Sequence, residues 1–343
     1  MVEFPVDSCE VRVEVAGIAS APSSIEERAE ALLDQLRRVV PFQAARVCLL
    51  DPERGAPVSL VSQGYDQAVS AYHDSPAVVE EFEVLGLDRM RPPICIRDLP
   101  VPPGEVRGWV EYLQPAGFRE GLAVGLFTPD GRHLGVLGLN TDTLVHPTEA
   151  ARDLIGQLAP LIAYAVDPLR SMVAAARLIH DAIAGIALTP AGHSLPVPGM
   201  PAHPLLSQGS PVLAVVAQQL AGGSHCVSFL CPYSTKEHLD GHVRVTVLAC
   251  VPQPASYLAA VVMVSPPGDV CGLTRRELEI LGLVVEGWSN QRIAPALGIT
   301  ARTVAADVEQ MLVKLGARTR ALAAIRSLNR GLYVPHLLVR SSE

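Results

Sequence analysis

Apolar residues recur at three- and four-residue intervals in several parts of the chain, and this spacing predicts amphipathic helices. Residues 23–40 show the pattern, because Leu32 and Leu36 fall on one face, a serine of the pair Ser23-Ser24 can cap the first turn and Pro41 ends the segment. Further helices are expected over residues 65–85, 106–113, 146–166 and 212–220.

Alternating or continuous apolar runs, bounded by turn residues, predict strands. The turn Pro129-Asp130-Gly131 separates two such runs and predicts a hairpin. Residues 1–20 alternate only weakly and are expected to form an edge strand or a loose arm. The other strands are expected within residues 45–64, 91–104, 117–142, 184–195 and 240–267.

The order of these elements predicts an α+β fold, in which helices pack on sheets. Residues 21–170 resemble a GAF domain, through the opening amphipathic helix, a late hairpin that ends in LGVLGLNTD and a closing helix that starts PTEAARDL. Residues 171–265 resemble a small PAS-like α+β domain, through a strand–glycine turn–strand start and two long final strands. These resemblances imply a sensor region that responds to a small-molecule effector or to a partner.

Composition agrees with a folded chain of two or three domains. The 343 residues are 49% hydrophobic and 18% charged, which excludes a disordered protein. No apolar run reaches the length of about 18 residues that a membrane span requires, and residues 1–20 do not resemble a signal peptide. We therefore expect a cytoplasmic protein with no membrane contact, whose seven cysteines are reduced.

Charge is distributed unevenly along the chain. The net charge is −8, but residues 272–343 carry ten Arg or Lys and six Asp or Glu, which leaves +4 there and −12 elsewhere. A mildly basic end on an acidic body is typical of a nucleic-acid-binding module attached to a part that does not bind nucleic acid.

Residues 272–343 follow a short linker at 266–271 and predict an all-α domain of four short helices. Thr274 and Glu277 have the spacing of a capping box, and Thr300 can cap a later helix. Two short helices joined by a tight glycine turn make a helix-turn-helix, whose second helix lies in the major groove of DNA. The alternative interpretation is an apolar bundle used for docking or dimerisation, without DNA contact.

This segment resembles the LuxR-type DNA-binding domain. The resemblance implies a transcriptional regulator that binds double-stranded operator DNA as a homodimer, with contacts through residues 321–328, 25–40 and 150–166. It is carried by Leu273-Thr274, Arg276-Glu277, Glu279-Ile280-Leu281, Glu286-Gly287, Ser289-Asn290, Ile293-Ala294, Leu297-Gly298-Ile299, Thr303-Val304, Leu312, Lys314-Leu315-Gly316 and Arg318.

Residues 301–315 form the expected recognition helix. At helical spacing, Val304, Val308, Met311 and Leu315 fall on one buried stripe, which leaves the opposite face for base edges and phosphates. The predicted DNA-binding residues are Arg292, Thr300, Arg302, Thr303, Ala306, Glu309, Gln310, Lys314, Arg318 and Arg320.

The recognition helix departs from the family pattern at Ala305, Asp307 and Glu309, where basic, histidine or small polar residues are common. One interpretation is altered specificity, since Glu can accept a hydrogen bond from cytosine N4. The other is weak binding, since each lost phosphate contact removes affinity from counterion release. We expect binding that is retained but weak or dimer-dependent. Pro295 is expected inside the second helix of this domain, which it would shorten or kink.

Four aromatic residues of the GAF-like region are candidates for the wall of an effector pocket. They are Tyr72, Trp109, Tyr112 and Phe118. Ordinary core packing is the alternative, because aromatic residues make up only 4% of the chain and each is needed as a packing anchor.

His238 and His242, with Cys226 and Cys231 nearby, are of metal-ligand type, but the Asp240-Gly241 turn between the histidines favours a polar loop. Cys48 and Cys95 lie in apolar strands and are expected in the core. No P-loop, nucleophile elbow or metalloprotease motif occurs in the sequence, so we predict no catalytic residues, metal or cofactor.

Three hypotheses follow from the sequence. The first is a DNA-binding regulator controlled by its sensor region. The second is a regulator that acts through protein contact, with weakened DNA binding. The third, an enzyme built on the sensor scaffold, lacks a nucleophile–base pair and is disfavoured.

Overall fold

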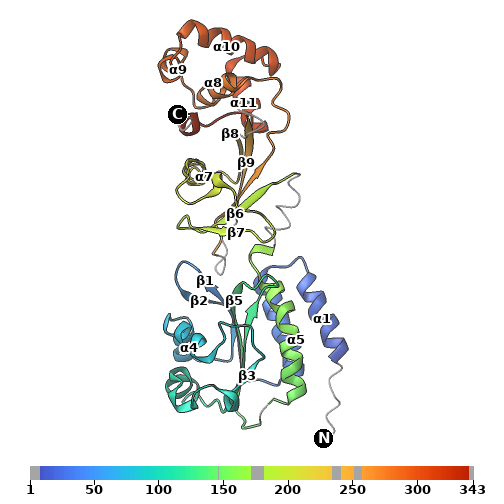
Figure 1. The fold of residues 1–343 in the computed structure, drawn as a ribbon. Helices are drawn as coiled ribbons and strands as arrows, with labels where there is room; N and C mark the ends of the chain where they lie inside the picture. The colour runs from blue at the N-terminus through green and yellow to red at the C-terminus, as the bar shows by residue number, and fades with distance from the viewer. Residues whose placement is uncertain (1–7, 146, 171–180, 234–240, 251–256, 340–343) are drawn as a thin grey trace. The chain divides into compact units, whose positions relative to one another are not determined.

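The computed structural model describes residues 8–145, 147–170, 181–233, 241–250 and 257–339 (Figure 1). The described residues form two compact units: residues 8–170 with Tyr257 form the first, and the other described residues between 181 and 339 form the second. Each unit contains a five-stranded sheet with antiparallel pairing, so the predicted α+β class is confirmed. None of the helices in the described ranges is long and apolar enough to span a membrane.

Residues 8–20 form helix α1 (Ser8–Ser20), and the expected edge strand or loose arm is wrong for this segment. Val11, Val15 and Ala19 are buried and lie four residues apart, on one helical face. Val13 lies between them and is 67% exposed. The alternation of valines imitates a strand, but packing of α1 against its neighbours selects the helix.

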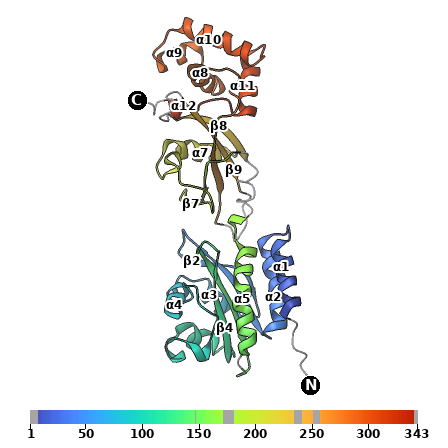
Figure 2. The ribbon, with the colours of Figure 1, turned by 45° about the vertical axis from the view of Figure 1, so that its right-hand side comes forward.

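Helices α2 (Ile25–Val39) and α5 (Glu149–Val166) pack with α1 on one face of the first sheet (Figure 2). Ser24 and Glu27 form a reciprocal capping box at the start of α2. The Thr148 hydroxyl accepts a hydrogen bond from the Ala151 N–H and caps α5. Both predicted helices are therefore confirmed, and Ser24 is the serine that caps the first of them.

The first sheet has the strand order β2-β1-β5-β4-β3. Val47 and Leu137 are paired across β1 and β5 and belong to the core under the three helices, while their neighbours Cys48 and Val136 face the opposite side. The strands are β1 (Ala44–Asp51), β2 (Ala56–Gln63), β3 (Ile94–Cys95), β4 (Glu120–Phe127) and β5 (His133–Thr141).

Short helices cover the opposite face of this sheet, as Figure 2 shows for α3 and α4. The predicted helix over residues 65–85 is present as two helices, and the one over 106–113 is largely a π-helical turn. The covering elements are α3 (Gln67–His73), α4 (Ala77–Leu85), η1 (Ile96–Asp98), η2 (Pro103–Glu105) and η3 (Trp109–Leu113).

The sheet of the second unit has the order β7-β6-β10-β9-β8, which repeats the topology of the first sheet. The predicted strands and the helix over 212–220 are confirmed, whereas β8 was not predicted. The elements are β6 (Ala184–Leu188), β7 (Ser194–Pro196), η4 (Pro204–Leu206), α7 (Pro211–Ala221), β8 (Cys226–Pro232), β9 (His242–Ala249) and β10 (Ala260–Ser265).

The four predicted C-terminal helices are present, and a fifth short helix follows them. Thr274 and Glu277 form the expected capping box. The second helix of the group ends at Ala296, one residue after Pro295, in agreement with the expected shortening. The helices are α8 (Arg275–Val285), α9 (Asn290–Ala296), α10 (Ala301–Lys314), α11 (Arg320–Arg330) and α12 (His336–Val339).

Within the second unit, the sheet and the C-terminal helices share one hydrophobic core. The N–H of Leu230, on the edge strand β8, donates a hydrogen bond to the Tyr333 carbonyl oxygen. The Arg244 guanidinium on β9 donates to the carbonyl oxygens of Pro267 (2.7 Å) and Arg330 (2.6 Å). One side chain therefore fastens both the segment before α8 and the end of α11 to the sheet.

Candidate nucleic-acid interface and ligand cavity

Helix α10 presents a polar outer face and a buried inner face. The Thr300 hydroxyl accepts a hydrogen bond from the Thr303 N–H and caps the helix. On the inner face, Val304 and Met311 are fully buried, Leu315 is buried and Val308 is half-buried, as expected. The residues exposed on the other side include Arg302, Ala306, Glu309 and Gln310. The helix therefore has the two-sided character that groove insertion requires.

Two of the cations expected at the DNA backbone have contacts inside the protein. The Lys314 ammonium lies 2.6 Å from a carboxylate oxygen of Glu277. Burial alone would raise the pKa of Glu277, but hydrogen bonds from Lys314 and Thr274 outweigh it and lower that pKa. Arg320 donates to Asn290 Oδ1 (2.7 Å) and to the Trp288 carbonyl oxygen. Both cations help to hold the helices together, and their DNA contacts stay predictions.

The remaining predicted cations are more available. Arg302 and Arg318 are exposed, and no described residue forms an ion pair or hydrogen bond with either side chain. Arg292 is exposed and stacks over the Trp288 ring at 3.8 Å from its centroid. These three arginines keep outward-facing N–H donors for a phosphate backbone.

The acidic residues of α10 differ in placement. Asp307 is half-buried, and its Oδ2 is enclosed without a hydrogen-bond partner among the described residues. Glu309 is exposed on the outer face between Ala306 and Val313, which is itself 82% exposed. Glu309 is therefore the carboxylate that a DNA groove would meet.

Helix α11 exposes apolar side chains, with Ile325 54% and Leu328 48% exposed. Single exposed apolar residues are common, but two within one helical turn form a small patch on one face. The predicted dimer contact over residues 321–328 includes both.

A cavity of about 130 Å³ lies on the face of the first sheet opposite α1, α2 and α5. Short residues on the central strands leave this space, because Gly121 and Gly138 have no side chain and Ala123 has only a methyl group. A Cβ built on Gly138 would meet no atom within 4 Å. Most of the lining is apolar, including Val78, Leu85, Leu122 and Val136 among others.

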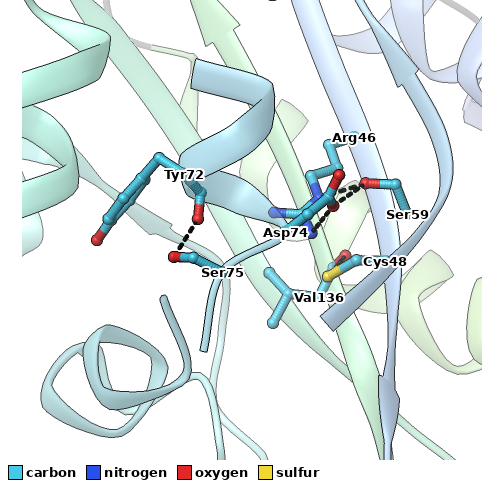
Figure 3. Close-up of polar contacts among 7 residues, drawn as sticks. All are labelled: Arg46, Cys48, Ser59, Tyr72, Asp74, Ser75 and Val136. Carbon is cyan, nitrogen blue, oxygen red and sulfur yellow. Dashed lines mark hydrogen bonds and ion pairs between the residues drawn. The ribbon is translucent and has the colours of Figure 1, made fainter. Parts of the chain in front are cut away.

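The cavity contains Arg46, which sequence reasoning did not single out. The residue is 5% exposed, and its charge is matched by Asp74 at 3.2 Å. Figure 3 shows Asp74 between Arg46 and Ser59, where Asp74 Oδ1 also accepts a hydrogen bond from the Ser59 hydroxyl (2.8 Å). A polar residue inside the otherwise apolar strand ARVCLL was the signal for this site.

Three other ionisable residues of the cavity, His73, Tyr65 and Tyr72, are uncharged at neutral pH. Burial lowers the pKa of His73 to about 3, and the nearby Arg46 adds to the effect. Burial raises the pKa of Tyr65 far above its ordinary value, and burial and the Glu81 carboxylate do the same for Tyr72. The Tyr65 hydroxyl donates to Asn140 Oδ1 at 2.6 Å.

The four predicted pocket aromatics divide into two pairs. Tyr72 and Trp109 line the cavity. Tyr112 stacks on Tyr72 with ring centroids 4.2 Å apart, and Phe118 packs edge-on against Tyr65 at 5.6 Å. Tyr112 and Phe118 therefore support the wall from behind, and a ligand role for any of the four stays a prediction.

The cysteines and histidines considered for other chemistry have ordinary surroundings where the structure describes them. Cys48 and Cys95 are buried, as expected, and burial raises the pKa of both thiols. Cys226 is exposed and Cys231 is buried on β8, while His238 lies outside the described residues. Among the described residues, no three His, Cys, Asp or Glu side chains gather as a metal site would require.

Structural comparison finds partial similarity to several solved proteins. The Escherichia coli SdiA structure matches with a TM-score of 0.35 and 14% identity, over 95% of this chain and 98% of that one. A GAF domain of a phosphoenolpyruvate-protein phosphotransferase from Coxiella burnetii matches with a TM-score of 0.37 and 20% identity, over 49% and 97%. Vibrio cholerae VqmA, in a complex with ligand and DNA, matches with a TM-score of 0.21 and 22% identity, over 37% and 68%. All three TM-scores lie below 0.5, so these matches carry no argument about family or function.

Sequence comparison is specific for the C-terminal helices. Over 60 residues, 18% of this chain, the sequence is 45% identical to the response regulator protein VraR of Staphylococcus aureus. The chain spans 29% of the length of that relative. Residues 272–327 match the family model for bacterial regulatory proteins of the luxR family. The helix-turn-helix segment at residues 272–327 therefore belongs to the luxR family of bacterial regulatory proteins.

Proposed function

We propose that the chain is a cytoplasmic transcriptional regulator that binds operator DNA through α9 and α10. The observation that carries the proposal is the outer face of α10, a capped recognition helix with exposed Arg302, Glu309 and Gln310, inside a luxR-family segment. The first unit, with its lined cavity, is the proposed sensor for a small molecule or partner. Ligand binding shifts the population of DNA-binding-competent arrangements.

The proposal includes a homodimer. Operators of helix-turn-helix proteins commonly present two half-sites to a symmetric dimer, and the exposed Ile325 and Leu328 offer an apolar contact on α11. The contacts expected through residues 25–40 and 150–166 involve α2 and α5, which pack beside α1. Sedimentation equilibrium of the wild type and of Ile325→Glu tests the α11 contact, and an unchanged dimer in the variant contradicts it.

A salt titration of DNA binding tests the main proposal. Affinity of the full chain for genomic operator fragments should fall steeply with salt, because each phosphate contact releases counterions. Arg302→Ala should weaken binding and reduce the slope of log affinity against log salt by about one. Arg89→Ala, an exposed arginine of the first unit, is the matched control and should change neither.

A second candidate function is regulation through protein contact, with DNA affinity largely lost. It is favoured by the exposed Glu309 on α10 and by the internal contacts of Lys314 and Arg320. Absence of DNA binding even at low salt would contradict the proposed DNA-binding function and support regulation through protein contact.

The variant Glu309→Lys distinguishes the two interpretations of the acidic residues on α10, which are weakened DNA binding and altered base specificity. If the variant binds all sequences more tightly, Glu309 limits non-specific binding by repelling phosphate. If it relaxes the preference at one base position only, Glu309 reads a base. Glu309→Gln is the companion variant, because it removes the charge and keeps the shape.

A further inference from the structure

The cavity of the first unit limits its occupant in size. Its volume is about 130 Å³, and an apolar cavity of similar size, about 150 Å³, binds benzene. The occupant therefore has about six to nine non-hydrogen atoms and a compact shape. Its body contacts the apolar lining, which Trp109 and Leu122 exemplify.

Two N–H donors in the wall lack an acceptor. Arg46 uses Nε for Ser59 and Nη2 for Asp74, and no residue of the described part accepts from Nη1. Asn140 uses Oδ1 to accept from Tyr65, and its Nδ2 likewise has no acceptor there. Both residues line the cavity and are buried. Buried donors without partners are costly, so an occupant that supplies an acceptor is favoured.

The two donors belong to neighbouring strands. Arg46 pairs with Gly138 across β1 and β5, and Asn140 follows Gly138 by two residues, so it points to the same face. Diagonal neighbours of this kind lie within reach of one ligand atom group. The missing side chain at Gly138 leaves the space between the donors open.

The charged residues of the cavity wall determine whether the ligand's hydrogen-bond acceptor is neutral or anionic. Asp74 already pairs with Arg46, and the Glu81 carboxylate lines the cavity. The cavity lining therefore contains one carboxylate, and its one arginine already has a counter-charge in Asp74, so an anion would find no unmatched positive charge. His73 and Tyr65 are uncharged, so neither offers a counter-charge.

We infer that the cavity binds a small, neutral carbonyl compound, whose oxygen accepts hydrogen bonds from Asn140 Nδ2 and Arg46 Nη1. This inference rests on the proposed sensor role of the first unit and names the chemical class of its effector. Asn140 is the specificity-determining residue, because its amide hydrogen bonds distinguish a carbonyl from a hydrocarbon of the same shape.

Three probes of nearly equal shape test the inference on the full chain. They are acetophenone, which has a neutral carbonyl group, ethylbenzene, which has no acceptor, and benzoate, which is anionic. Dissociation constants come from chemical-shift titrations monitored by NMR. Acetophenone should bind at least about fivefold more tightly than ethylbenzene, because one net hydrogen bond alone gives that gain, and benzoate should bind most weakly. Equal binding of acetophenone and ethylbenzene, or preference for benzoate, overturns the inference.

Two variants locate the binding. Gly138→Val fills the open space, and should abolish binding of both acetophenone and ethylbenzene. Ser62→Val, at an exposed strand position of β2, is the matched control and should bind both as the wild type does. Asn140→Leu should reduce the preference for acetophenone over ethylbenzene and leave the affinity for ethylbenzene unchanged. Retained acetophenone binding in folded Gly138→Val places the site elsewhere and refutes the inference.

The salt titration of DNA binding is independent of these probes. If the protein binds DNA but shows no preference for acetophenone, the proposed DNA-binding function stands and the inferred effector class is wrong. If the protein prefers acetophenone but does not bind DNA, the inferred carbonyl site stands and the proposed DNA-binding function is wrong.

Discussion

Arg244 offers the sharpest test of how the C-terminal helices are attached to the second sheet. Its guanidinium donates to the Pro267 carbonyl oxygen from Nη2 (2.7 Å) and Nε (3.2 Å), and to the Arg330 carbonyl oxygen from Nη1 (2.6 Å). Arg244→Met keeps most of the apolar stem and removes every donor. The variant therefore isolates the hydrogen bonds from the packing.

The cost follows from the number and kind of these bonds. A hydrogen bond with a charged partner contributes about 1.5–3 kcal/mol, and the carbonyl oxygens of Pro267, Arg330 and Gly331 lose their donor. Arg244 is half-buried, and burial lowers its pKa, so removing the guanidinium also relieves some desolvation. We expect Arg244→Met to lower the free energy of unfolding of the second unit by about 2–4 kcal/mol.

Urea unfolding with tryptophan fluorescence measures this change. The chain has two tryptophans, so a Trp109→Phe background leaves Trp288 as the reporter of the C-terminal helices. Arg244→Lys should be nearly as destabilised as Arg244→Met, because one compact ammonium group does not span two separate carbonyl groups. Arg302→Met, an exposed arginine on α10, is the control and should change stability by less than about 0.5 kcal/mol. Full stability of Arg244→Met would show that apolar packing alone attaches the helices, and would refute the reasoning.

Two further predictions concern stability. Gly282→Ala should destabilise the second unit by about 1–3 kcal/mol in urea unfolding despite the better helix propensity of Ala, because a Cβ there would lie 1.8 Å from the Val334 carbonyl oxygen. Gly17→Ala, on the exposed face of α1 with nothing within 4 Å of the new Cβ, should instead stabilise by about 0.5–1 kcal/mol, and equal effects at the two sites would contradict the packing argument. His73→Phe should flatten the acid side of the pH–stability curve. The wild type has a folded pKa of about 3 against an unfolded value of about 6.5, so its stability is full above pH 6.5 and falls by up to about 1.4 kcal/mol per pH unit towards pH 3. Parallel curves for the wild type and the variant would show that His73 does not titrate differently on folding.

Caps and periodicity predicted most helices, because their causes are local. Ser24, Thr148, Thr274 and Thr300 each cap the helix that follows in the structure, and the apolar spacing behind them places the buried face. The luxR-family segment was predictable for the same reason, since caps, turns and stripe all fall within one short stretch.

Features that depend on distant residues were missed. Val11, Val13 and Val15 alternate as in a strand, and only contact with α2 and α5 makes the segment helical. The strand β8 forms a backbone hydrogen bond with the C-terminal segment, and no local sequence pattern predicts this contact. The internal contacts of Lys314 and Arg320 also come from other helices.

The cavity was predictable only in part. Tyr72 and Trp109 were expected, but Arg46 and Asn140 were not, because strands separated by most of the first unit bring them together. Each is a polar residue at the inward position of an apolar strand. A polar residue at such a position indicates a binding site within the sheet.

The pairing of Leu230 with Tyr333 also bears on aggregation. An uncovered edge strand offers backbone donors and acceptors to any other chain, and proteins usually protect such edges. Here the chain's own final segment occupies part of the edge at β8, and Tyr333 and Val334 are buried there. A chain cut after Asn329 would expose this edge and the apolar surface beneath it. Intermolecular sheet formation, rather than simple loss of a tail, is the expected fate of such a fragment.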